Sequence, residues 1–169
     1  MLATEELWFR RAFLSRRGCP VLLLLFLCFF LVSCRTPGRL PAANLTEPGW
    51  TVYQGQLLWK PPGQTVEIAA EFLAAFHPDG RSIVQATKNP FPLVIAQTDA
   101  QRWQIEFVPD NRFFSGRKPP PARLVWFQLL PGLSGHEVSP PWRLNRLSKK
   151  RLAFENPKTG ERIELWCTS

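Results

Sequence analysis

Apolar and polar residues alternate most clearly over residues 66–76. The apolar set occupies every second position: Val66, Ile68, Ala70, Phe72, Ala74 and Phe76. A period of two is that of a β-strand with one buried face. Pro78-Asp79-Gly80 follows with residues that favour a turn. We therefore expect residues 81–88 to return as the second strand of an antiparallel hairpin.

The same reasoning predicts further strands later in the chain. Residues 91–97 and 102–108 are expected strands, separated by a turn at 98–100. The second strand places three large apolar side chains on one face: Trp103, Ile105 and Phe107. Residues 152–154 and 162–167 flank Asn156-Pro157-Lys158-Thr159-Gly160, whose glycine can adopt a positive φ and close another hairpin.

Residues 119–132 break this alternation. Three prolines at 119–121 precede the apolar run 122–130, and Pro131-Gly132 follows it. Proline before a first turn and Pro-Gly after the last residue are typical helix limits. We expect a short helix over 122–130, with Leu124 and Phe127 on its apolar face. A buried strand is the alternative, since a short apolar run fits both periods.

The first third of the chain has a different pattern. Four arginines between positions 10 and 17 precede twelve uncharged residues at 21–32, which is the layout of a signal peptide. Twelve residues are too few to cross about 30 Å of hydrocarbon as a helix. Because seventeen uncharged residues separate Arg17 from Arg35, an uncleaved anchor is the alternative. Arg10-Arg11 also fits a twin-arginine signal, although the strong hydrophobicity favours ordinary secretion. Both interpretations export residues 35–169.

Leu31-Val32-Ser33-Cys34 ends this apolar run. It resembles the lipobox of bacterial lipoproteins, which implies cleavage before Cys34, lipidation of its thiol, and anchoring to membrane lipid in the cell envelope. By the same resemblance, an Asp after Cys34 would favour the inner membrane, so Arg35 at that position favours the outer membrane, with the domain facing the periplasm, over the inner membrane as the alternative. Residues 1–33 are then the signal peptide, 34–49 the lipidated cysteine with a flexible Pro-rich tether, and 50–169 an antiparallel β domain.

Charge narrows the partners only slightly. The chain has 21 Lys and Arg against 13 Asp and Glu, a net charge of +8. This balance favours anionic surfaces such as lipid headgroups or nucleic acid. An exported domain does not normally meet nucleic acid, so we expect none. The dense basic clusters are Arg117-Lys118 and Lys149-Lys150-Arg151.

Motifs for catalysis or for a bound metal are missing from the sequence. No CxxC pair, HExxH, GxSxG, P-loop or dinucleotide fingerprint occurs. His77 and His136 lie beside turn residues, where solvated or capping histidines are common. Glu67 and Glu71 would lie roughly 13 Å apart along a strand, too far for a carboxylate pair. We therefore expect no enzymatic activity and no cofactor.

Large apolar side chains are abundant instead. Six of the seven tryptophans follow residue 49. We expect some apolar residues to line a groove in a sheet curved into a half-open barrel, open to acyl chains. The predicted groove comprises Val66, Ile68, Phe72, Phe76, Trp103, Ile105, Phe107, Leu124 and Phe127. The alternative is an envelope scaffold or accessory protein with a filled core that binds a protein partner.

Four segments carry a family resemblance: Gly55-Gln-Leu-Leu-Trp-Lys60, the strand ending at Phe76 with Pro78-Asp79-Gly80, the helix near 124–130, and the hairpin at 156–161. Together they resemble the LolA/LolB-like lipoprotein-sorting proteins. The resemblance implies an unclosed antiparallel barrel covered by helices, whose apolar interior holds acyl chains of other lipoproteins. The fold class expected is mainly β (α+β), with a single antiparallel sheet, one short helix, and a monomeric state.

Overall fold

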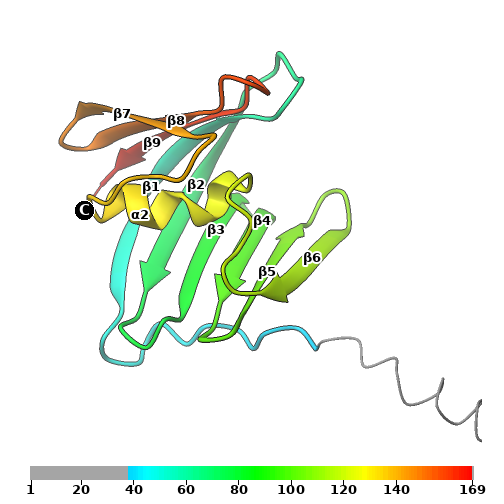
Figure 1. The fold of residues 1–169 in the computed structure, drawn as a ribbon, viewed down its shortest axis with the longest axis vertical. Helices are drawn as coiled ribbons and strands as arrows, with labels where there is room; N and C mark the ends of the chain where they lie inside the picture. The colour runs from blue at the N-terminus through cyan, green and yellow to red at the C-terminus, as the bar shows by residue number, and fades with distance from the viewer. Residues whose placement is uncertain (1–37, 169) are drawn as a thin grey trace, which may run out of the picture. The chain divides into compact units, whose positions relative to one another are not determined.

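A computed structural model describes residues 38–168. The predicted signal peptide and Cys34 lie outside the described residues. Nine strands form one antiparallel sheet in the order β6-β5-β4-β3-β2-β1-β9-β8-β7 (Figure 1). Their bounds are β1 Thr51–Lys60, β2 Ile68–Phe76, β3 Ser82–Lys88, β4 Phe91–Thr98, β5 Arg102–Phe107, β6 Arg112–Arg117, β7 Arg143–Ser148, β8 Arg151–Glu155 and β9 Arg162–Cys167. Within 38–168, no helix is long and apolar enough to cross a membrane.

The strands follow two meanders that meet at β1. Strands β1 to β6 pair in sequence, and β7 to β9 form a second run whose last strand pairs with β1. The predicted hairpins around residues 78–80 and 156–160 are confirmed. The predicted fold class, a mainly β protein with one curved, half-open sheet and a short helix, is confirmed as well.

Sequence reasoning did not assign β6 and β7, and these two strands are the edges of the sheet. Most of their side chains are exposed. A strand with little burial on either face has no need to alternate apolar with polar residues, so it has no period-two signal.

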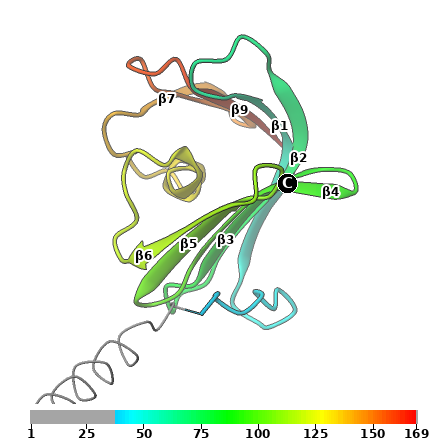
Figure 2. The same ribbon diagram turned by 90° about the vertical axis from the view of Figure 1, so that its right-hand side faces the viewer.

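The concave side of the sheet is covered by a short helical segment (Figure 2). It consists of the 3₁₀ turn η1 (Val125–Phe127) and the helix α2 (Leu129–Leu133), which contacts β2 and β8. The predicted helix over 122–130 therefore begins before the observed helical segment, which starts at Val125, and stops before its end at Leu133. Pro131 lies within the first turn of α2, where its missing N–H costs no hydrogen bond. Gly132 lies against Phe154, so the Pro-Gly pair belongs to the helix rather than ending it.

The predicted strand at 66–76 is shorter than expected. Strand β1 ends at Lys60, before Pro61-Pro62, and its last pair with β2 joins Trp59 to Ile68. Val66 therefore has no partner strand and lies in the β1–β2 connection with 67% of its surface exposed.

Part of the predicted tether is bound to the sheet. Arg39 Nη2 lies 3.1 Å from Glu106 Oε1, and the Leu40 amide donates a 2.7 Å hydrogen bond to Gln104 Oε1. Farther along, Glu47 forms an ion pair of 2.9 Å with Arg81. From Arg39 onward the chain therefore belongs to the folded unit.

Candidate functional site

An apolar groove of about 550 Å³ opens at one end of the concave face. It lies among the ends of β1, β2 and β4 to β6, the segment before η1, and the β8–β9 turn. Its apolar wall consists of Trp59, Ile68, Leu93, Trp103, Phe107, Phe114, Leu124, Val125 and Trp126, with Pro61, Pro62, Pro109 and Pro121 at the margin.

Aromatic rings from four elements meet in this wall. The rings of Trp59 and Trp126 pack edge to face, with centroids 5.2 Å apart, and Phe107 stacks beside Trp59 at 6.4 Å. Phe107 in turn meets Phe114 of β6 edge to face at 6.4 Å. Such edge-to-face and stacked contacts are favourable arrangements of aromatic rings, so the wall is a continuous apolar surface.

Strand alternation explains how Trp59 reaches the groove. Leu57 and Trp59 share the concave face of β1, and Leu57 is buried in the core while Trp59 lies at the strand's end. Trp59 is opposite Ile68 on β2 and Ile163 on β9. Leu57 therefore belongs to the buried core, while Trp59 near the end of the strand lines the groove.

Glu161 is one of two acidic residues that line the groove, and Asp110 is the other. The Trp59 indole Nε1–H donates a 3.2 Å hydrogen bond to Glu161 Oε1, at the end of the β8–β9 turn. Burial raises the pKa of Glu161 above its ordinary value, while the hydrogen bond from Trp59 opposes that rise. The carboxyl group is therefore protonated more readily than one in water.

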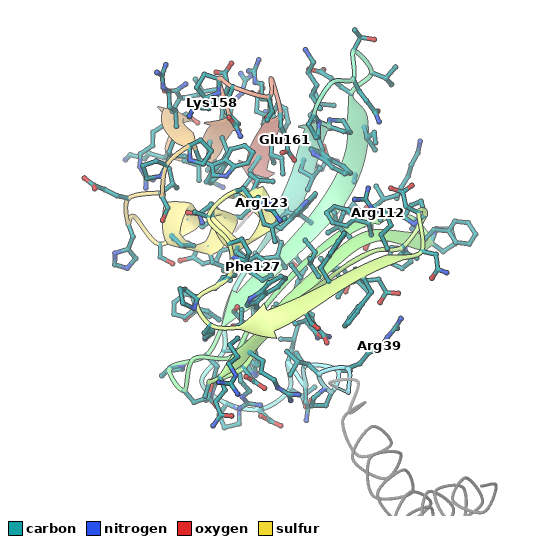
Figure 3. The ribbon with its side chains drawn as sticks, turned by 45° about the vertical axis from the view of Figure 1, so that its right-hand side comes forward. Arg39, Arg112, Arg123, Phe127, Lys158 and Glu161 are labelled. Carbon is teal, nitrogen blue, oxygen red and sulfur yellow. The ribbon has the colours of Figure 1, made fainter. Side chains whose placement is uncertain are left out.

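Three other charged residues surround the opening: Asp110, Arg112 and Arg123. The Arg112 guanidinium lies 5.4 Å from the centre of the Phe114 ring, a cation–π distance. Figure 3 shows Arg112, Arg123 and Glu161, which come from β6, the segment before η1, and the β8–β9 turn. Residues 38–168 hold no group of three His, Cys, Asp or Glu side chains that could bind a metal.

Four of the nine residues predicted for the groove line it, namely Ile68, Trp103, Phe107 and Leu124. Phe72 and Ile105 instead belong to the core beneath the helical segment, with 3% and 0% exposure. Phe76 packs against that core. Phe127 packs edge to face on Trp103 at 5.7 Å, and Val66 is exposed.

The difference arises because the helical segment packs over part of the concave face. Trp126 and Leu129 are almost completely buried there, in one cluster with Phe72, Ile105 and Phe154. Apolar alternation identifies the concave face, but it cannot tell which part of that face the helix covers. The interior described by residues 38–168 is therefore packed beneath α2, and the groove opens beside η1.

Sequence reasoning also missed groove residues. Leu93 enters the groove at a register shift between β3 and β4, next to Ala86 and Thr87, and no local pattern announces such a bulge. Trp59 could have been found, because Leu57 and Trp59 alternate with polar or half-buried neighbours.

Two other depressions, of about 530 and 520 Å³, lie over the middle strands. Polar side chains contribute to the lining of both, but Leu57, Leu58 and Trp166 also line the first, which therefore has a single aromatic ring rather than several. Volume alone therefore does not distinguish the groove, but its aromatic wall does. Comparison of the chain with known protein families and with curated proteins gives no match.

Proposed function

We propose that the groove binds the acyl chain of a lipid, or of another lipoprotein, without catalysing a reaction. The observation that carries this proposal is the aromatic wall around about 550 Å³ of open space. A methylene group is close in size to a water molecule, whose share of the liquid is roughly 30 Å³. The groove thus has room for one long acyl chain, within the usual size range of ligand sites.

The signal-peptide pattern and the sequence Leu31-Val32-Ser33-Cys34 support a location at a membrane for this acyl-chain binding. A diacylated Cys34 would hold the β domain beside a bilayer of the bacterial envelope, where acyl chains are abundant. The experiment for this part is Cys34→Ser in the full chain. We expect loss of cleavage and loss of lipid labelling, and unchanged processing would contradict the anchor.

Filling the groove tests chain binding. In Leu93→Trp the larger ring would occupy the space beside Phe107, while the buried core beneath α2 keeps all its side chains. Val52→Trp is the matched control, since it adds the same ring at an exposed position of β1. The full chain in neutral phospholipid nanodiscs is photolysed with palmitate bearing a diazirine, and the attached peptides are identified by mass spectrometry.

We expect cross-links to β5 and to the segment around Leu124 in the parent chain and in Val52→Trp, and at least a tenfold reduction in Leu93→Trp. If all three proteins give the same pattern, or if none is labelled in the groove, chain binding is wrong.

The alternative function is that of an envelope scaffold that binds a protein partner. The filled core beneath α2 and the two unpaired edge strands favour it. For a scaffold, Leu93→Trp would leave capture of a specific partner unchanged, and the photolabel would attach without preference for the groove.

A further inference from the structure

The β7–β8 hairpin has a charge pattern unrelated to the groove. Residues 138–154 contain five basic side chains and no acidic ones. The five are Arg143, Arg146, Lys149, Lys150 and Arg151. Strand β7 is an edge of the sheet, and only Leu144 among its side chains is not exposed. These cations therefore lie at the molecular surface, although Arg146 Nη2 donates a 2.8 Å hydrogen bond to the Gly132 carbonyl of α2.

One apolar side chain lies among the cations. The register between β7 and β8 shifts between Arg146 and Ser148, so that Leu147 is the extra residue of a β-bulge. A bulge turns a side chain out of the regular alternation. Leu147 is 50% exposed, although Leu144 on the same strand packs against the core. The folded unit therefore leaves about half of the Leu147 surface in contact with water.

The hairpin keeps most of its positive charge. Arg151 and Arg162 share one buried carboxylate, that of Glu164, so a single negative charge faces two guanidinium groups. Among residues 38–168, Lys149 and Lys150 take part in no ion pair. The lysines at the turn are consequently available to an external anion.

The backbone of this turn is held in place. The Lys150 carbonyl accepts a 2.9 Å hydrogen bond from the Cys167 amide on β9, and the Lys150 amide donates to Ser148 Oγ at 3.3 Å. The Arg151 guanidinium lies 5.2 Å from the centre of the Trp166 ring. A fixed turn loses little conformational entropy when it meets a surface.

We propose that the tip of the β7–β8 hairpin docks on an anionic lipid surface, with Leu147 in the interfacial layer and Lys149 and Lys150 at headgroup phosphates. Leu147 is the reason for choosing a membrane over another polyanion. Its apolar surface gains free energy only where an apolar layer can cover it, whereas a soluble polyphosphate would leave it in water. This inference does not depend on chain binding by the groove.

The test uses the full chain in phosphatidylcholine vesicles with and without phosphatidylglycerol. Hydrogen–deuterium exchange of the amides in residues 143–151 reports contact between the hairpin and the vesicle. It does so whether or not the N-terminal part of the chain also holds the protein at the membrane. We expect slower exchange there in the anionic vesicles alone, and loss of this protection as salt is raised.

Lys149→Gln/Lys150→Gln removes two charges from the tip. Near an anionic membrane each cation contributes about a fivefold change in binding, so the docked fraction relative to the free one should fall on the order of 30-fold at low ionic strength. Lys88→Gln/Arg117→Gln is the matched control, because both residues are exposed and lie on other strands. We expect the control to keep its protection, and Lys149→Arg/Lys150→Arg to restore it.

Three results would overturn the proposal. The first is equal exchange at 143–151 in neutral and anionic vesicles. The second is an equal effect of the lysine pair and the control pair. The third is unchanged vesicle protection in Leu147→Ser together with equal protection by soluble polyphosphate, which would make the hairpin a site for polyanions rather than for membranes. Near-ultraviolet circular dichroism checks that each variant is folded.

Discussion

Replacing Gly132 with alanine has two opposite effects on the free energy of unfolding, and their magnitudes can be compared. In a helix, alanine is favoured over glycine by about 1 kcal/mol, so helix propensity alone predicts stabilisation. However, a Cβ atom at position 132 would lie 2.5 Å from Phe154 Cζ and 2.6 Å from its Cε1. Phe154 is completely buried, so its ring can yield only by displacing the side chains packed around it. Overpacking of this kind costs about 1–3 kcal/mol.

We therefore expect Gly132→Ala to lower the free energy of unfolding by about 1 kcal/mol, the difference between the two effects. Urea denaturation followed by tryptophan fluorescence measures this change. A double-mutant cycle with Phe154→Leu isolates the contact, because the smaller side chain leaves room for the added methyl group. In the Phe154→Leu background, Gly132→Ala should be neutral or stabilising.

The reasoning would be refuted by a Gly132→Ala protein as stable as the parent chain or more so. Additive effects of the two substitutions would also refute it, since the loss of stability would then have a cause other than the contact between position 132 and the Phe154 ring.

Two further predictions concern Phe72 and Glu161. Phe72→Ser should lower the free energy of unfolding by at least about 3–5 kcal/mol, the usual loss for a buried phenylalanine, because Phe72 is 3% exposed; a folded protein that has lost only chain binding would contradict this. For Glu161, the pKa in the folded state lies above the ordinary value of 4.5, so the folded state binds more protons than the unfolded state. The free energy of unfolding therefore falls as the pH rises from 4.5 toward the raised pKa. Glu161→Gln should remove this decline in thermal-unfolding scans at pH 4 and pH 7, and an unchanged decline would show that another group causes it.

The sequence was informative where burial has a regular period. Residues 68–74 show period-two burial, which ends where Ala74 and Ala75 are both buried, and the turn residues after Phe76 and Glu155 place the ends of two hairpins. The edge strands had no such signal, because their side chains face solvent whatever the register. Pro131-Gly132 was misleading because the local preference of these residues for ending a helix gave way to the close packing of Gly132 on Phe154.

The groove was predictable only in part. Alternation placed Trp103 and Phe107 on the concave face, but the same rule placed Phe72 and Ile105 there. Which of them meet open space depends on where Trp126 and Leu129 insert, and that is decided by contacts between segments far apart in the chain. Leu93 entered through a bulge, which depends on pairing between two strands rather than on either strand alone.

The two edge strands have a mechanical consequence. In a closed barrel, backbone hydrogen bonds fix the circumference, whereas here β6 and β7 are joined only by the chain segment that carries η1 and α2. The spacing between the two halves of the sheet is set by how side chains such as Trp126 interdigitate. The distance between β6 and β7 can therefore change without the loss of any backbone hydrogen bond between strands. The opening can accommodate ligands of different width, and the only cost is the loss of side-chain packing contacts.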